Sequence, residues 1–316
     1  MDLIIDQQHA DKRLDKFLAD FSLSEKDLSG FSRGDFIRAV KEGQVLVNKQ
    51  ISKPSYRIKI GDKINILIQK KEEQLIPNPS IKLAIIFEND NFLVINKPAG
   101  IQVHPDFNEK ENTLVNGLIA HYPKISRLED DPTYSYRMRP GIVHRLDKNT
   151  SGILIIAKNK KSFLEFKKMF QEKTIQKKYL AIVYGIPETK EGEINKPLAR
   201  TTNYRKQTIA GKKTKTKIRE ALTKYRVIKE FKDNFSLLEV SPRTGRTHQI
   251  RVHLASIDHP IVGDNLYQKK KYSKFESAKR QMLHAGEIKF KLWGEEFFFT
   301  APAPEDFQKI IKNLKS

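Results

Sequence analysis

The sequence of 316 residues contains no cysteine, which excludes disulfide bonds, thiolate metal sites and a cysteine nucleophile. Its N-terminal segment lacks a basic stretch followed by a long apolar one, so we expect no signal peptide. No apolar run approaches the roughly eighteen residues that a membrane-spanning helix needs. These absences predict a cytoplasmic protein that does not cross a membrane.

Positive charge is what the sequence has in excess. Lys and Arg total 59 against 38 Asp and Glu, which gives a net charge of +21. Such an excess favours a polyanionic partner, either nucleic acid or an anionic membrane surface. A solvated lysine-rich surface would have the same composition. The length leaves room for one large domain and a small one, each with its own core.

Residues 139–158 hold the first candidate for chemistry. Two short β-branched runs, at 141–143 and 153–156, are typical of buried strands, and residues 147–152 between them are rich in turn formers. The pattern predicts that Asp147 lies on a loop between two strands, where a rigid scaffold can aim its carboxylate. An aspartate that merely caps a turn would give the same local pattern. Basic and polar residues surround it in the sequence: Arg139, His144, Arg145 and Lys148.

The first seventy residues form a unit of their own. Apolar residues at helical spacing predict one helix near residues 12–19 and a second near 32–40, with Ser32 as its N-cap. Short strands follow, ending at residue 68. The segments RLDKFLA, SRGDFIRAVKEG, VLVN and IKIGDKI resemble the alpha-L RNA-binding motif shared by a small-subunit ribosomal protein and several RNA-modifying enzymes.

That resemblance implies a small α+β RNA-binding domain over residues 1–70, with Arg13 and Arg33 among its RNA contacts, followed by a linker at 71–80. A generic small domain with solvated lysines is the alternative. The sequence departs from the motif at Asn48-Lys49, where the family usually has Asn-Gly.

Residues 81–316 are expected to form the larger domain. Helices are predicted at 113–121 and 162–171, and strands at 83–87, 92–96, 179–184, 223–228, 236–240 and 297–299. Many strands with few helices predict an α+β fold built on a large mixed, mainly antiparallel sheet with flanking helices. The basic, weakly patterned residues 200–217 predict an exposed hairpin or loop, either solvated or in contact with phosphate.

A second polar cluster lies at residues 244–254, TGRTHQIRVHL. Its two histidines, His248 and His253, are five residues apart and would point to different sides of a helix. Because no Cys or acidic ligand accompanies them at metal spacing, we reject a zinc site. Arginine and glutamine beside a turn suit phosphate binding or a buried ion pair, and a polar surface patch explains them equally well.

Together, several segments resemble the RluA/RluD family of pseudouridine synthases in order and spacing: FENDNFLVINKPAGIQVHP, RPGIVHRLDKNTSGILIIAK, KKYLAIVYG, SPRTGRTHQIRVHLASIDHPIVGD and the later MLHA. The resemblance extends over nearly the whole chain and implies an enzyme of the type that acts on large-subunit ribosomal RNA. It implies that Asp147 is the catalytic aspartate and that Tyr179 lies against the target base. Arg251, rather than Arg246, is implied as the salt-bridge partner of Asp147.

The same resemblance implies further contacts with RNA. Leu283 matches an apolar pocket residue, and Arg145 matches an arginine that enters the RNA beside the flipped nucleotide. For Tyr179 and Leu283, plain core packing is the alternative. Further candidates for RNA binding come from the two polar segments: His144, Arg246 and His248. The implied enzyme works as a monomer and needs neither a metal nor a cofactor.

The implied reaction makes sense of these residue types. It breaks the C1′–N1 bond of uridine and rejoins the uracil through C5, so nothing is oxidised or hydrolysed. An ionised carboxylate acts near C1′, either as a nucleophile or as a base that removes a ribose proton. A paired guanidinium keeps that carboxylate charged and oriented. A hydrolytic glycosidase usually needs two carboxyl groups across the scissile bond, and the two polar segments supply one obvious acid.

Other functions fit parts of the sequence. A non-catalytic RNA-binding ribosome-assembly factor, a synthase acting on transfer RNA and an RNA N-glycosidase are the alternatives. Two stretches depart from the family's pattern and could alter the choice of RNA: residues 106–108, where a glycine-rich turn is usual, and the longer, more acidic residues 125–136.

Overall fold

A computed structural model of the protein describes residues 1–25, 28, 31–68, 74–106, 108–128, 138–201, 206–268, 272 and 275–314. Parts of both departures from the family pattern, Phe107 and residues 129–137, therefore lie outside the described residues. The chain divides into two compact units, the first running from Met1 to Gln74 and the second beginning at Leu75. Among the described residues, no helix is long and apolar enough to cross a membrane.

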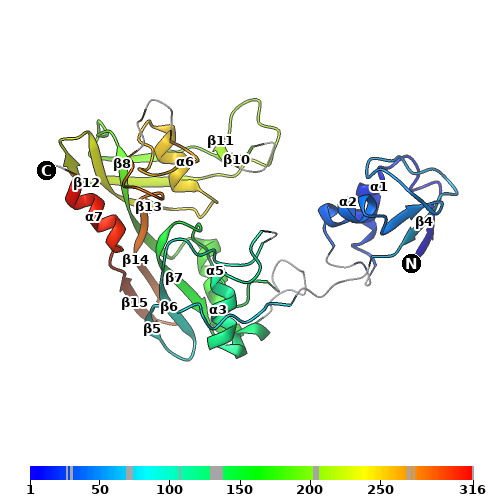
Figure 1. Ribbon diagram of the computed structural model, residues 1–316, viewed down its shortest axis with the longest axis horizontal. Coiled ribbons are helices and arrows are strands. Elements are labelled where there is room, and N and C mark those ends of the chain that lie inside the picture. Colours follow the sequence, from blue (N-terminus) through cyan, green and yellow to red (C-terminus); the bar gives the residue numbers. More distant parts are fainter. Residues whose placement is uncertain are drawn as a thin grey trace. The chain divides into compact units, whose positions relative to one another are not determined.

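The first unit packs two helices on a four-stranded antiparallel sheet (Figure 1). The helices are α1 (Leu14–Phe21) and α2 (Arg33–Lys41), and the sheet order is β1 (Asp2–Ile4), β4 (Lys63–Ile66), β2 (Val45–Val47), β3 (Gln50–Ile51). The predicted N-cap is confirmed, since the Ser32 side chain accepts from Asp35 N and the Asp35 carboxylate accepts from Ser32 N. The core of this unit joins Leu14, Leu18, Phe36, Val40 and Ile64.

The turn between β2 and β3 retains the geometry that Asn-Gly would give. Asn48 has φ of 53° and Lys49 has φ of 64°, so both central residues are left-handed, as hairpin turns of this type require. Asn48 adopts this conformation at little cost. At Lys49 the conformation is strained, because the Cβ of Lys49 crowds the following carbonyl oxygen. The departure from the family pattern therefore costs conformational energy without removing the turn.

The second unit is built on a nine-stranded sheet, which confirms the predicted α+β class and mainly antiparallel sheet. Its strands are β5 (Ile85–Glu88), β6 (Phe92–Lys97), β7 (Ser151–Ala157), β14 (Leu283–Leu292), β8 (Gln176–Tyr184), β13 (Phe235–Pro242), β12 (Leu222–Phe231) and β9 (Glu191–Asn195) in that order, with β15 (Glu295–Thr300) paired to β14. Only β7 and β14 pair in parallel among these described strands. Strands β10 (Leu198–Arg200) and β11 (Gln207–Ile209) pair as a short separate hairpin that overlaps the predicted basic stretch at residues 200–217.

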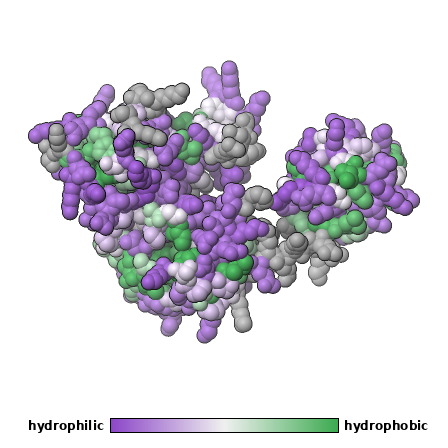
Figure 2. Space-filling view, in the orientation of Figure 1, coloured by the Kyte–Doolittle hydropathy of each residue, from purple (hydrophilic) through white to green (hydrophobic). Residues whose placement is uncertain are grey.

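Helices cover both faces of the β6–β7 part of the sheet. The helices of this unit are α3 (Leu114–His121), the 3₁₀ helix η2 (Pro123–Arg127), α5 (Lys160–Glu172), α6 (Gln249–Ser256) and α7 (Glu305–Asn313). Leu93 and Ile95 of β6 pack in the cluster with α3, whereas Phe92 and Val94 pack in the cluster with α5. This alternation is what a strand buried on both faces shows. Hydrophilic residues occupy much of the visible surface of each unit (Figure 2).

Residues 141–143 do not form the strand that their sequence predicts. Ile142 makes one isolated bridge to Ile156, and Gly141 has φ of 72°, which turns the chain out of extended structure. In place of a backbone partner, the ring of His144 accepts the Ile155 N–H at 2.8 Å. A side chain thus takes one of the hydrogen bonds that a neighbouring strand would have made.

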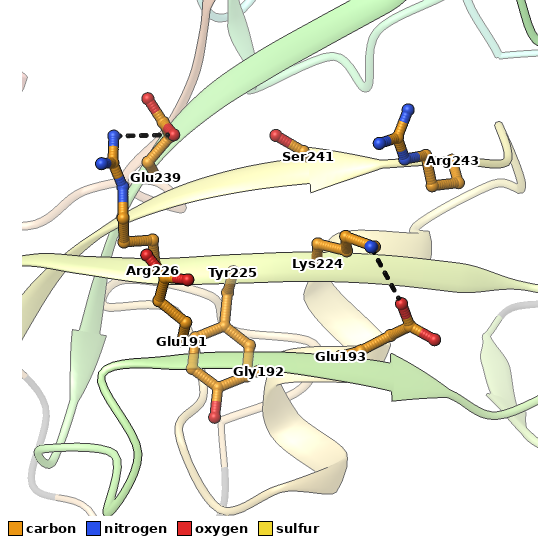
Figure 3. Close-up of a pocket in the computed structure, with 9 residues that line it drawn as sticks. All are labelled: Glu191, Gly192, Glu193, Lys224, Tyr225, Arg226, Glu239, Ser241 and Arg243. Atoms are coloured by element: carbon orange, nitrogen blue, oxygen red, sulfur yellow. Dashed lines mark hydrogen bonds and ion pairs between the residues drawn. The ribbon is translucent and has the colours of Figure 1, made fainter.

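A polar groove lies on the sheet where β9, β12 and β13 adjoin (Figure 3). Its charges compensate one another: Lys224 lies 3.4 Å from Glu193, and Arg226 lies 3.1 Å from Glu239. Exposed ion pairs of this kind contribute little to stability. None of the site residues predicted from the sequence lines this groove.

Candidate active site

The loop that carries Asp147 is a tight turn at the start of β7. Thr150 N donates to Asp147 O at 3.0 Å, which closes an i to i+3 turn. The Asp147 side chain is 17% exposed, so it is accessible from solvent without being freely solvated. The sequence predicted this placement on a loop, although only one of the two flanking strands exists.

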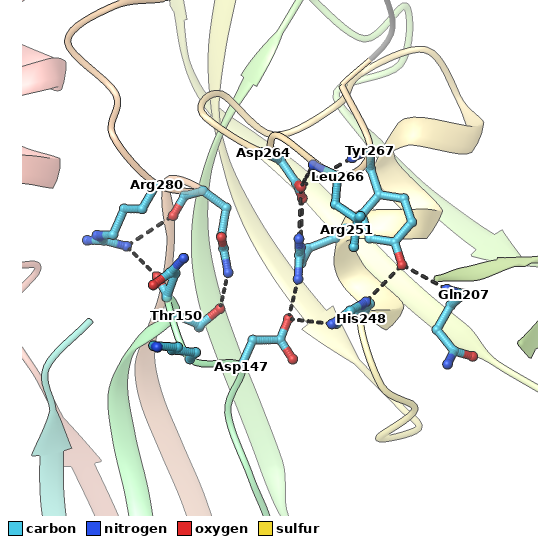
Figure 4. A network of polar contacts seen from close by, with 12 residues as sticks. Asp147, Thr150, Gln207, His248, Arg251, Asp264, Leu266, Tyr267 and Arg280 are labelled. Carbon is cyan, nitrogen blue, oxygen red and sulfur yellow. Dashed lines mark hydrogen bonds and ion pairs between the residues drawn. The ribbon is translucent and has the colours of Figure 1, made fainter. Parts of the chain in front are cut away.

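Arg251 reaches Asp147 from helix α6. Its Nη1 donates to Asp147 Oδ2 at 2.8 Å (Figure 4), and its side chain is 8% exposed. The two polar segments of the sequence therefore meet in space. Arg246 does not take part, because its Nε donates to the carbonyl of Glu220 instead.

A second acid, Asp264, holds the other side of the same guanidinium. Arg251 Nε and Nη2 donate to the two carboxylate oxygens of Asp264 at 2.7 and 2.8 Å, and Asp264 is fully buried. Burial alone would lower the pKa of Arg251, but the hydrogen bonds and charges of Asp264 and Asp147 outweigh it and raise the pKa. The guanidinium is therefore a permanent cation in a fixed orientation.

Asp264 was not predicted from the sequence, although it ends one of the segments that carry the resemblance. The residue before it, Gly263, has φ of 76°, and a Cβ there would lie 2.0 Å from the carbonyl oxygen of Arg280. Only glycine fits this approach. A glycine followed by an acid at the end of a polar segment was the one available signal.

Tyr179 and Leu283 lie on the neighbouring strands β8 and β14, and the charge of Asp147 acts on Tyr179. Tyr179 of β8 pairs with Ala285 of β14, and Leu283 pairs with Ala181, so all four side chains share one face of the sheet. Tyr179 is 9% exposed, and no hydrogen bond of its hydroxyl is seen within the described residues. Burial, and then the negative charge of Asp147, raises the pKa of the Tyr179 hydroxyl, which stays neutral.

His248 lies on the other flank of Asp147. Its Nε2 is 3.9 Å from Asp147 Oδ2, and its Nδ1 is 2.8 Å from the hydroxyl of Tyr267. Burial lowers the pKa of His248, with the charge of Asp147 acting against the shift. The ring of Tyr267 also lies 5.1 Å from the Arg251 guanidinium, so this aromatic supports both basic neighbours of Asp147.

Comparison with known proteins shows the family of this chain. Residues 91–256 match the sequence profile of RNA pseudouridylate synthases, and residues 28–64 match the S4 domain. The chain belongs to the RNA pseudouridylate synthase family. It is therefore an isomerase that acts on RNA, and its first unit carries an S4 domain.

Relatives of this synthase match along nearly its whole length. An RNA pseudouridine synthase of Bacillus subtilis, described as uncharacterized, is 37% identical over 100% of this chain and 98% of that protein. Ribosomal large subunit pseudouridine synthase D of Neisseria meningitidis serogroup A is 34% identical over 99% of this chain and 81% of that protein. Among solved structures, human RNA pseudouridylate synthase domain containing 1 superposes with a TM-score of 0.57 and 26% identity, covering 72% of this chain and 86% of that one.

Two of the remaining candidates lie in the segment before Asp147 and differ in their contacts. The side chain of Arg145 is exposed. His144 stacks on Phe170 with ring centroids 4.6 Å apart. Burial, with a smaller effect from Lys177, lowers the pKa of His144 to about 3. His144 is thus a neutral residue bound to β7, whereas Arg145 is exposed to solvent.

Two buried cations that the sequence did not predict hold the loop of this synthase. Lys97 is fully buried, and its Nζ donates to three carbonyl oxygens, those of Pro98, Ile101 and Lys148. Burial lowers the pKa of Lys97 to about 7, against the effect of the nearby Asp147. Because Lys148 follows Asp147 directly, Lys97 fixes the backbone beneath the proposed catalytic acid.

Arg280 holds the next carbonyl of the loop. Its Nη1 donates to Asn149 O at 3.1 Å, while Nε and Nη2 donate to the carboxylate of Asp306 at 2.7 and 2.9 Å. Asp306 lies in the first turn of α7. The last described helix of the synthase is therefore linked to its Asp147 loop through one guanidinium.

The arginines predicted for the first unit share one buried acid. Arg13 and Arg33 both donate to Asp15, which is fully buried, while the arginine side chains stay 43% and 45% exposed. Burial acts to raise the pKa of Asp15, but the hydrogen bonds from Arg13 and Arg33 outweigh it and lower the pKa. The pair presents two oriented guanidiniums at the surface.

His253, the second histidine of the rejected zinc site, points into the protein. Its Nδ1 lies 2.8 Å from Thr223 Oγ1 and its Nε2 lies 2.9 Å from Lys196 O. Both ring nitrogens are therefore occupied within the fold.

Proposed function

We propose that this synthase isomerises specific uridines of large-subunit ribosomal RNA and that Asp147 is its catalytic carboxylate. The observation that carries the assignment is the hydrogen bond from Arg251 to Asp147, made by a guanidinium that Asp264 holds on its other side. The fixed cation orients the partly exposed carboxylate for either role, nucleophile or base.

In the proposed reaction the carboxylate of Asp147 acts next to C1′ of the target. The C1′–N1 bond breaks, the uracil turns, and a C1′–C5 bond forms; the proton at C5 leaves to solvent while N1 gains one. Asp147 either attacks C1′ or removes a ribose proton, and both routes need the same ionised oxygen. Arg251 orients that oxygen in each case.

The target base has to leave its stack to reach this site. Tyr179 and Leu283 supply an aromatic and an apolar wall on the same face of the sheet, and we assign them to the pocket of the extruded uracil. We assign Arg145, which is exposed two residues before Asp147, to the gap left in the RNA. His144, His248 and Arg246 remain candidates for supporting contacts.

We assign residues 1–70 to RNA capture, 71–80 to a linker and 81–316 to catalysis. The S4 match and the oriented pair of Arg13 and Arg33 support the first assignment. The preference for large-subunit ribosomal RNA comes from relatives named ribosomal large subunit pseudouridine synthase D. Transfer RNA is the alternative substrate.

A tritium-release assay tests this function directly. We expect the protein to release tritium from 5-tritiated uridine in large-subunit ribosomal RNA and not from transfer RNA. Asp147→Asn should abolish release while RNA binding persists. Release of free uracil would instead identify an N-glycosidase, and RNA binding without release by the parent protein would identify a non-catalytic assembly factor.

A further inference from the structure

Lys177 lies near the two segments that carry Asp147 and Arg251 but has no part in the site described so far. It precedes Tyr179 by two residues on β8, and because strand side chains alternate, the two point to the same face. Lys178 points to the opposite face, where its Nζ lies 3.1 Å from Glu239 and 3.4 Å from Glu287. The two adjacent lysines therefore point to opposite faces of the strand, and Lys178 has two acidic partners on its face.

The neighbours of Lys177 come from the two segments that carry Asp147 and Arg251. Its charge acts on His144, in the segment before Asp147. A Cβ on Gly245, in the turn before α6, would lie 4.0 Å from Lys177 Nζ. Lys177 therefore lies near both segments, and its neighbours His144 and Gly245 each precede an arginine, Arg145 and Arg246.

Lys177 is a half-buried cation without an acidic partner. Its Nζ lies 5.6 Å from the centroid of the Phe170 ring, and within the described part of the chain it forms no ion pair and no hydrogen bond. Burial lowers its pKa to about 8, so it is still mainly protonated at neutral pH. Holding such a charge away from water is unfavourable unless an anion binds to it.

We propose that Lys177 binds a backbone phosphate of the RNA next to the target uridine. The inference rests on the proposed function, which brings RNA to the Asp147 site. Two residues of strand separate Lys177 from Tyr179 by roughly 7 Å, which sets the ammonium beside the base pocket, where the chain of the flipped nucleotide continues.

The neighbouring lysines provide a matched test. Lys177→Gln and Lys178→Gln remove one charge each from opposite faces of the same strand, and Lys177→Arg restores the charge. For Lys177→Gln we expect KM for a large-subunit ribosomal RNA transcript to rise about tenfold with kcat nearly unchanged, because a charged hydrogen bond is lost. In an Asp147→Asn background, the plot of log Kd against log salt should become shallower by about 0.7 to 1.

Lys178→Gln should change neither quantity, and Lys177→Arg should restore most of the affinity. An unchanged KM and salt slope in Lys177→Gln would overturn the proposal and leave Lys177 as a packing partner of Phe170. A fall in kcat alone would also overturn it, since that points to a contact with the reacting base. Because the salt slope is measured without turnover, it decides the role of Lys177 even if the parent protein makes no pseudouridine.

Discussion

Asp147 and Arg251 are separated by 104 residues in the chain, yet Arg251 Nη1 donates to Asp147 Oδ2 over 2.8 Å. Arg251 donates one hydrogen bond to Asp147 and two to Asp264. Its orientation is therefore set mainly by the buried Asp264, and Asp147 receives a donor that is already in place. In the proposed mechanism, Asp147 reacts, Arg251 orients it, and Asp264 holds Arg251 in place.

The first prediction concerns Asp264. In Asp264→Asn, the side chain keeps one acceptor oxygen and turns an NH₂ group toward the guanidinium, so Arg251 loses its fixed orientation. We expect kcat to fall about tenfold to a hundredfold, the loss of one charged hydrogen bond, with RNA affinity unchanged. Single-turnover tritium release and filter binding measure the two effects, and Glu295→Gln on exposed β15 is the control. A variant with full kcat would show that Asp147 needs no help from Asp264.

The second prediction concerns the link between α7 and the Asp147 loop. The hydrogen bond from Arg280 lowers the pKa of Asp306 below its ordinary value of 3.8. Burial of the carboxyl group acts in the opposite direction but is the smaller effect. A lowered carboxyl pKa stabilises the fold above pH ~4, and this contribution is lost as pH falls below that value. At pH 7 the free energy of unfolding of the parent protein should be about 1 kcal/mol higher than that of Asp306→Asn. Denaturant titrations should show that difference shrinking toward pH 3; a difference independent of pH would contradict the ion pair.

What the sequence could predict follows from how local each feature is. Ser32 and its capping box lie within four residues, and the Asp147 and Arg251 segments carry enough specific positions to be matched to a family. Lys97 and Arg280 were missed because their roles depend on contacts with residues 51 and 131 positions away in the chain. The strand predicted at 141–143 was wrong because Gly141, with φ of 72°, turns the chain out of extended structure, so that only one isolated bridge forms at Ile142.

The third prediction concerns RNA capture by the first unit. Arg33→Gln removes one surface guanidinium and leaves Arg13 to pair with the buried Asp15, so the fold should persist. Since each phosphate contact releases counterions, we expect weaker RNA binding and a plot of log Kd against log salt that is shallower by about one. The kcat should not change. Arg57→Gln, another exposed arginine of the same unit, is the control, and an equal loss in both variants would indicate diffuse charge in place of a specific contact.

The fourth prediction concerns the left-handed Lys49. Lys49→Gly should raise the free energy of unfolding by about 0.5 to 1 kcal/mol, because relief of the strained conformation outweighs the added freedom of the unfolded chain. Lys53→Gly, at an exposed position whose φ is not positive, should lower stability slightly. Thermal unfolding of the three proteins compares them, and a loss of stability in Lys49→Gly would show that the lysine side chain makes a contact that matters.

The fifth prediction uses the different titration of the two adjacent lysines. Burial lowers the pKa of Lys177 to about 8, whereas a hydrogen bond with Glu239 raises the pKa of Lys178. His144 stays neutral over this range, since its pKa is about 3. Above pH 8 the side chain of Lys177 is mainly uncharged in the free protein. It must then take up a proton to bind a phosphate, so binding becomes weaker. The affinity advantage of the parent over Lys177→Gln should therefore shrink from pH 7 to pH 9, measured by RNA binding at constant salt. Lys178→Gln should match the parent throughout. If the advantage of the parent stays constant across this range, the half-buried ammonium is not what meets the RNA.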